Sequence, residues 1–146
     1  MTLRQTELKF QNHIIDSYEK CGGRARKWAS EWQKGMPDLI CSLPGVGGHL
    51  LEVKHRPEFG PMKRIIKNPL EPKQRDEAKK YMEAGCDVFV AIVACETLAL
   101  KSRLLLFDPL ADLMHYNEEE SVPYEPGKGY YVRGLIEEAI IGAKNG

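Results

Sequence analysis

Residues 36–54 read MPDLICSLPGVGGHLLEVK, and they carry the clearest structural pattern in the chain. It contains two short apolar runs, 37–43 and 49–54, separated by a turn rich in Pro and Gly, which is typical of a β-hairpin. Alternate side chains share one face of a strand, so Glu52 and Lys54 point the same way. The stretch therefore predicts two antiparallel strands, one of which holds a carboxylate and an amine side by side.

A second carboxylate can reach the same place from the first strand of the hairpin. Asp38 follows a proline at the start of that strand. Carboxylate oxygens are the ligands that Mg²⁺ prefers, and a bound divalent cation polarises a phosphate and activates a water. Lys54 would orient that water and neutralise the developing charge. Asp38, Glu52 and Lys54 together predict metal-assisted phosphodiester cleavage, with Mg²⁺ as the cofactor and Mn²⁺ as a substitute.

The remaining periodicity predicts a single α/β domain over residues 1–146. The run at 87–94 is continuously apolar and follows a helix, which is typical of a crossover to a buried parallel strand. We expect a mixed central sheet flanked by helices, built from three antiparallel strands and this crossover strand. The expected elements are a helix at 6–20, strands at 24–32, 37–43 and 49–54, a loop at 56–72, a helix at 72–82, strands at 87–94 and 103–107, a short helix at 108–114, an acidic loop at 117–129 and a helix at 132–144.

One acidic residue of the first helix stands out. Projected at helical spacing, Glu7 falls within the apolar stripe that contains Phe10, Ile14 and Tyr18. A carboxylate aimed at apolar surface is costly unless it is paired or binds a cation. Glu7 is therefore either a cation ligand or a solvated residue near the helix end, and the pattern leaves both open.

The overall charge of zero conceals two opposite regions. Residues 1–80 contain 16 Lys and Arg against 10 Asp and Glu, net +6, and residues 81–146 contain 5 against 11, net −6. Such asymmetry suggests a polyanionic partner for the first region. Overall neutrality argues against histone-like wrapping and predicts a shallow dependence of binding on salt.

The segment after Lys54 concentrates the cations. Between residues 56 and 75 there are six Lys and Arg against Glu58 and Glu71. Because they follow the Glu52 strand directly, we expect them to contact DNA phosphates, the alternative being a merely solvated basic loop. The residues expected at this interface are Arg56, Lys63, Arg64, Lys67, Lys73 and Arg75.

The sequence lacks the characteristic features of several classes of protein. Four cysteines without a C-x-x-C pair, and histidines without ligand spacing, indicate reduced thiols and no zinc site. His13 and His115 are expected to be solvated. The glycines at 45–48 lack a following Lys-Ser/Thr, so no nucleotide cofactor is indicated. No apolar run approaches membrane-spanning length and no signal peptide is recognisable, which predicts a cytoplasmic protein that is not secreted and contacts no membrane.

The order and spacing of the motifs in this sequence resemble those of the PD-(D/E)XK nuclease superfamily. Gly35-Met36-Pro37-Asp38-Leu39-Ile40, a spacing of 13 residues, and then Glu52-Val53-Lys54 look like its bipartite signature. Pro72-Lys73-Gln74, opening the helix that ends at Gly85, is similar to the VRR-NUC and archaeal Holliday-junction resolvase branch. The resemblance is strongest over residues 6–95 and implies a restriction-endonuclease-like core. The segment between Lys54 and Gln74 is longer than the family pattern.

This resemblance implies a metal-dependent endodeoxyribonuclease acting on branched DNA, like the Holliday-junction resolvases of phages. Glu7, Asp38 and Glu52 would hold one or two metal ions with the Val53 carbonyl, and Gln74 would steady the site. If the gene is phage-borne, the protein would act in the cytoplasm of a bacterial host, in recombination and repair. Symmetric cutting of two strands implies a homodimer. The alternatives are a repair, restriction-like or flap nuclease, and a DNA-binding module that has lost turnover.

Overall fold

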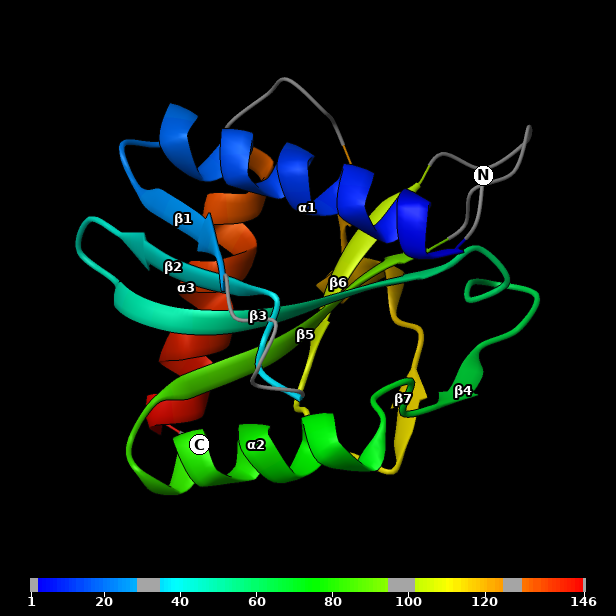
Figure 1. The fold of residues 1–146 in the computed structure, drawn as a ribbon. Helices are drawn as coiled ribbons and strands as arrows, with labels where there is room; N and C mark the ends of the chain where they lie inside the picture. The colour runs from blue at the N-terminus through cyan, green and yellow to red at the C-terminus, as the bar shows by residue number, and fades with distance from the viewer. Residues whose placement is uncertain (1–2, 29–34, 95–101, 125–129, 146) are drawn as a thin grey trace.

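The hairpin predicted around residue 45 forms and lies inside a six-stranded sheet (Figure 1). The computed structural model describes residues 3–28, 35–94, 102–124 and 130–145. The strand order is β1-β2-β3-β5-β6-β8, and only the β3–β5 pair is parallel. The strands of this sheet are β1 (Arg24–Lys27), β2 (Leu39–Leu43), β3 (Gly47–Arg56), β5 (Asp87–Ala94), β6 (Arg103–Phe107) and β8 (Val122–Pro123).

Helices cover both faces of the sheet. The helices are α1 (Leu3–Lys20), α2 (Pro72–Glu83) and α3 (Tyr130–Asn145), with a short 3-10 turn, η1 (Glu118–Glu120), before β8. Buried residues of α1 and α3 share one cluster with Leu51 and Val53 of β3, whereas Ala78 of α2 packs with Leu50 and Val88. Because neighbouring residues of a strand face opposite ways, α1 and α3 lie on one face and α2 on the other, as Figure 1 shows. None of the helices in these described ranges is long and apolar enough to cross a membrane.

The predicted crossover is confirmed. α2 begins at Pro72, where a proline suits the first helical position, and ends just before Gly85, whose φ of 96° favours glycine. The chain then enters β5, which is almost fully buried, in parallel register with β3: Glu52 aligns with Val90 and Lys54 with Ile92. The predicted mixed α/β sheet and the strand at 103–107 are confirmed as well.

Two predictions about local structure are wrong. The expected short helix at 108–114 is instead a turn followed by strand β7 (Leu113–His115). The expected loop at 56–72 contains strand β4 (Ile65–Lys67), which pairs with β7 in a separate two-stranded sheet. Three residues are too few for strand periodicity to be recognised, and the pairing joins segments about fifty residues apart. The strand expected at 24–32 forms over Arg24–Lys27, and residues 29–34 lie outside the described ranges.

Candidate active site

The candidate site lies where β2 and β3 separate. β2 begins at Leu39, opposite Leu51, but β3 continues to Arg56. Within the ranges that the structure describes, residues 52–56 therefore have a strand partner only on the β5 side. The other edge of β3 is open along the part of the strand that carries Glu52 and Lys54. A parting of strands leaves backbone groups and side chains accessible to a ligand.

Asp38 closes part of this open edge. Its Oδ2 accepts a hydrogen bond of 2.8 Å from the backbone N–H of Val53. The N–H and C=O of one strand residue point to the same edge, so the Val53 carbonyl also faces the opening. Asp38 is thereby held beside Glu52, as the sequence predicts. Its other carboxylate oxygen and the Val53 carbonyl are oxygen donors of the kind that a hard cation binds.

Glu52 is the most unusual residue of the site. Its side chain is 0% exposed, and neither carboxylate oxygen has a hydrogen-bond donor in the described part of the chain. Burial raises its pKa to about 9, the charges of Asp38 and Glu7 and the close contact with Asp38 add to the rise, and Lys54 opposes it. A carboxyl in contact with another carboxylate must share a proton or a cation with it. Glu52 and Asp38 together are thus suited to hold a divalent cation.

Glu7 approaches the site from α1. Its Oε2 is buried without a hydrogen-bond partner among the described residues, and it lies 4.0 Å from Nη1 of Arg56. The sequence leaves open whether Glu7 is solvated at the helix end, and the structure buries most of its side chain. No group of three His, Cys, Asp or Glu side chains in the described ranges is placed to hold one metal ion. Glu7 therefore adds negative charge near Glu52, the acidic pair Asp38–Glu52 is the candidate ligand set, and the role of Glu7 as a further ligand stays a prediction.

The first turn of α2 packs against the segment that leads into Asp38. Gly35 has a φ of 89°, and a Cβ there would lie 2.9 Å from the carbonyl oxygen of Lys73. The side chain of Gln74 is used at this helix end, because its Oε1 accepts a hydrogen bond of 3.0 Å from the Glu71 backbone N–H. Gln74 is thus a cap residue of a helix that supports the Asp38 segment. Its direct role in the site stays a prediction.

The predicted DNA-contacting residues divide into three groups. Arg56, Lys63 and Lys67 line one hollow of ≈ 490 Å³ beside β4. Arg64 and Lys73 are exposed. Arg75 differs, because its Nη2 donates to the Leu110 carbonyl at 2.7 Å and to the Asp112 carboxylate at 3.1 Å. The structure therefore gives Arg75 a bridging role between α2 and the loop before β7.

An aromatic cluster that the sequence patterns do not reveal fixes α1 against β3. The ring of Phe10 packs edge-on against His55, with centroids 4.9 Å apart, and against Tyr124, with centroids 5.0 Å apart. His13 hydrogen-bonds the Tyr124 hydroxyl and is half-buried, so the expectation that it is solvated is wrong. The cluster joins α1 to the strand of Glu52 one helical turn from Glu7. Only the three-dimensional contact of distant aromatics reveals it.

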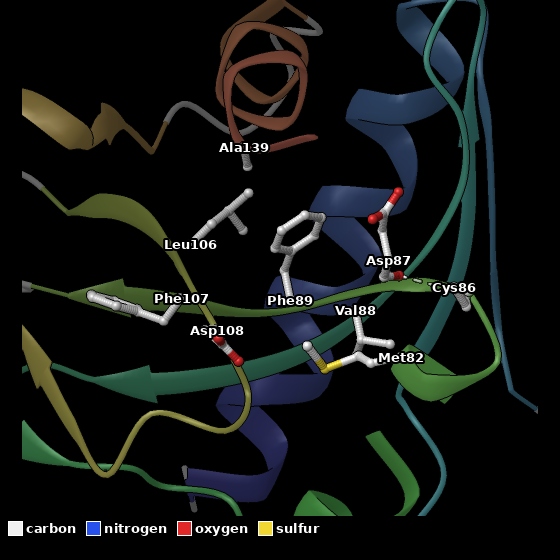
Figure 2. Close-up of a pocket in the computed structure, with 10 residues that line it drawn as sticks. Met82, Cys86, Asp87, Val88, Phe89, Leu106, Phe107, Asp108 and Ala139 are labelled. Atoms are coloured by element: carbon white, nitrogen blue, oxygen red, sulfur yellow. Dashed lines mark hydrogen bonds between the residues drawn. The ribbon is translucent and has the colours of Figure 1, made fainter. Parts of the chain in front are cut away.

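A second hollow lies away from these residues. It measures ≈ 390 Å³ and is lined by the end of α2, the start of β5, the end of β6 and Ala139 of α3. Figure 2 shows Phe89, Leu106 and Ala139 facing one another on one side of β5, with Met82 and Val88 on the other. None of the carboxylates or lysines of the candidate site lines it.

Comparison with solved structures identifies the fold. No family model matches the sequence, and no curated protein matches it either. A VRR_NUC domain is 28% identical, with 62% of this chain and 86% of that chain covered and a TM-score of 0.43. The Holliday junction resolvase Hjc of Archaeoglobus fulgidus, an archaeal hyperthermophile, is 18% identical, with 92% and 98% covered and a TM-score of 0.53. Both are of the PD-(D/E)XK nuclease superfamily. The resolvase structure, which covers 92% of this chain, shows that the chain has the same fold, the restriction-endonuclease-like fold.

Proposed function

We propose that the protein is a metal-dependent endodeoxyribonuclease that cleaves branched DNA. The observation that carries this proposal is the buried Glu52 carboxylate, which contacts Asp38 and has no hydrogen-bond donor among the described residues. Burying one carboxylate beside another is unfavourable unless something cationic is held there. A site of this kind at an open strand edge is suited to bind a phosphodiester together with a cation.

Each residue has a definite task in this proposal. Asp38, Glu52 and the Val53 carbonyl hold the cation, Mg²⁺ or Mn²⁺, since these donors are all oxygens. When bound, the cation supplies Lewis acidity toward the scissile phosphate and lowers the pKa of a water. Lys54 lies on the same strand face as Glu52 and lowers the pKa of its carboxyl, so its ammonium charge acts inside the site. It can orient the nucleophile and stabilise negative charge that develops on the phosphate.

Glu7 and Arg56 flank this centre. Their 4.0 Å separation leaves the charge of Arg56 partly compensated, and Glu7 adds negative potential beside Glu52. The negative potential of Glu7 makes the binding of a cation at Asp38 and Glu52 more favourable. In this proposal Arg56, at the end of β3, binds the phosphate next to the one that is cleaved.

DNA, and branched DNA in particular, is proposed as the substrate on two grounds. The solved structure with the same fold over 92% of this chain is described as a Holliday junction resolvase. Cations of the 56–67 segment line a hollow beside the strand of Glu52. A four-way junction has twofold symmetry, and paired cuts in it require two active sites, so we also propose a homodimer.

The absence of a three-residue ligand group in the described ranges favours one rival, a DNA-binding module that has lost turnover. A further rival is a repair, restriction-like or flap nuclease with the same site. Cleavage of a four-way junction, a flap and a plain duplex, with sedimentation of the same samples, separates the three. Preferential cutting of the junction by a dimer supports our proposal. Equal cutting of all three substrates contradicts the branched-DNA assignment, and no cutting in Mg²⁺ or Mn²⁺ favours the binding module.

A further inference from the structure

The small sheet formed by β4 and β7 presents one face to the surroundings. We call residues 61–67 and 113–115 the arm. Cross-strand partners share a face of an antiparallel pair, so Ile65, Lys67, Leu113 and His115 lie on the outer side. All four are exposed, whereas Ile66 and Met114 on the inner side are buried. The outer face is thus a two-stranded surface that nothing in the described structure covers.

The arm exposes an unusual share of large apolar side chains. Four large apolar side chains are strongly exposed in the described ranges, and three belong to the arm: Met62 at 95%, Ile65 at 50% and Leu113 at 50%. The fourth, Ile40 at 44%, lies on β2. Scattered apolar side chains are ordinary, but a cluster of them marks a contact surface.

The arm stands on the same face of the main sheet as the acidic pair. Its buried residues Ile66 and Met114 pack with Val90 and Ile92 of β5. Val90 aligns with Glu52 and Ile92 with Lys54, and aligned residues of paired strands point to the same side. Figure 1 shows β4 and β7 beyond the N-terminal end of α2, next to the last part of β3. The arm therefore lies on the side of the sheet that a ligand bound at Glu52 would occupy.

The base of the arm is held in place. The Asn68 amide donates to the carbonyls of Pro109 and Ala111 at 2.7 and 2.8 Å. Arg75 of α2 binds the Asp112 carboxylate at 3.1 Å. The apolar side chains are therefore presented on a fixed support, which lowers the entropy cost of using them for binding.

Cations surround the apolar side chains. Lys63 and Arg64 are exposed next to Met62, and Lys67 shares the outer face with Ile65 and Leu113. Lys63 and Lys67 also line a hollow together with Arg56, which is the last residue of the strand that carries Glu52. A symmetric contact between two copies of this chain through the arm would bring both clusters of cations into one interface, which is unfavourable. Apolar atoms framed by cations complement DNA whose bases are exposed between phosphates.

We propose that Met62, Ile65 and Leu113 pack against the faces of the base pairs that are exposed at a DNA branch point, while Lys63, Arg64 and Lys67 bind the flanking phosphates. The inference rests on the proposed function and assigns the preference for branched DNA to the arm. In an intact duplex the same contact requires a base step to be unstacked first, which is unfavourable. At a branch point the bases stack less stably, so the contact forms at a lower cost there and holds the bases apart.

The test uses the full chain carrying Lys54→Ala, which is expected to bind without cutting, and a four-way junction with 2-aminopurine at the branch point. Binding is expected to raise the 2-aminopurine fluorescence. Adding Met62→Ser, Ile65→Ser and Leu113→Ser is expected to remove this rise and to lower the preference for junction over duplex by roughly tenfold. The matched control, Ile40→Ser, removes the exposed apolar side chain outside the arm and is expected to change neither quantity.

The unfolding temperature of each variant shows whether it is folded, and single substitutions replace the triple variant if that variant unfolds early. Unchanged fluorescence and preference in folded arm variants overturn the inference. Sedimentation provides a second test. If the arm variants are monomers where the wild type is a dimer, and they still prefer the junction, the inference is overturned, because the arm is then a contact between two copies of the chain. Failure of the proposed function looks different: the Lys54→Ala protein then binds no DNA and the wild type cuts none, which overturns both proposals.

Discussion

The carboxylate of Asp38 takes the place of a strand partner for Val53, whose backbone N–H it binds at 2.8 Å where β2 has left β3. One side chain thus does two things. It satisfies a backbone group at an open strand edge, and it lies against the buried Glu52. Asp38 thus has a structural role toward Val53 and a proposed role in cation binding beside Glu52, and different substitutions of Asp38 should affect the two roles differently.

Asp38→Ala should destabilise the protein by about 1–3 kcal/mol, because it leaves the Val53 N–H without an acceptor. Asp38→Asn keeps an oxygen acceptor, so it should lose less stability while cleavage is still lost with the charge. Urea unfolding of both variants measures this difference. Asp16→Ala, which removes an exposed carboxylate paired with Lys20 on α1, serves as control and should change stability by less than about 0.5 kcal/mol. Equal stability of Asp38→Ala and wild type would show that the hydrogen bond is not used.

Glu52→Gln should stabilise the metal-free protein at pH 8 and abolish cleavage. The pKa of Glu52 is raised from 4.5 to about 9, so between these values the folded state keeps a proton that the unfolded state has lost. Stability therefore falls as pH rises through this window, by up to about 1.4 kcal/mol per pH unit, and glutamine removes the fall. Unfolding at pH 5 and pH 8 without divalent cation measures it.

Addition of Mg²⁺ gives this prediction a second readout. A cation that binds only the folded protein raises its stability, and it should do so for wild type and not for Glu52→Gln. The interpretation fails if the two proteins show the same pH dependence in EDTA and the same response to Mg²⁺.

Tyr18→Phe should destabilise the fold without any effect on the metal site. The Tyr18 hydroxyl donates to Nε2 of His49 at 2.6 Å, while Nδ1 of the same ring donates to the Gly47 carbonyl at 3.2 Å, so the ring is neutral. Loss of the hydroxyl leaves a buried acceptor and costs about 1–3 kcal/mol. Thermal unfolding at pH 8 measures it, and retained Mg²⁺-dependent cleavage shows that the site is intact.

Acid should destabilise the protein through the same histidine. Burial lowers the pKa of His49 below 6.5, so the unfolded chain takes up a proton first. Stability is therefore lost as pH falls below about 6.5, toward the lowered pKa of the folded state. Replacing His49 by Gln should weaken this loss, whereas His115→Gln, at an exposed position, should not. If His49→Gln leaves the dependence of stability on pH unchanged, the acid sensitivity arises from a residue other than His49.

Lys63→Ala with Lys67→Ala should weaken DNA binding to all sequences alike and lower the slope of log K against log salt by roughly two, because two phosphate contacts are lost. Lys79→Ala, at an exposed position of α2, is the matched control and should leave the slope unchanged. Fluorescence anisotropy at several salt concentrations measures both. The net charge of zero predicts a shallow slope for the wild type, and a steep slope would contradict the inference that structure, more than bulk charge, decides binding.

The sequence was sufficient to predict what depends on local patterns. Alternation along 49–54 placed Glu52 and Lys54 on one face, and the helix at 72–82 followed by an apolar run predicted the parallel strand β5. Helical periodicity singled out Glu7, whose carboxylate is indeed buried near Glu52. In each case the deciding neighbours lie within one element or one hairpin.

What could not be predicted depends on distant contacts. β4 and β7 are three residues long, and each is defined by pairing with the other, so 108–114 was wrongly predicted as a helix. Arg75 has the charge of a DNA-binding residue, and only the position of Asp112 shows its bridging role. The cluster of Phe10, His55 and Tyr124 likewise brings together three distant segments.

Cleavage of a labelled four-way junction during a Mg²⁺ titration, with wild type beside Lys54→Ala, is the most direct test of the proposed chemistry. We predict no cleavage in EDTA, saturable cleavage as Mg²⁺ is added, and a loss of roughly 10²–10³-fold in Lys54→Ala with junction binding retained. Cleavage that persists in EDTA, or that proceeds at the wild-type rate in Lys54→Ala, would contradict the assignment of the site.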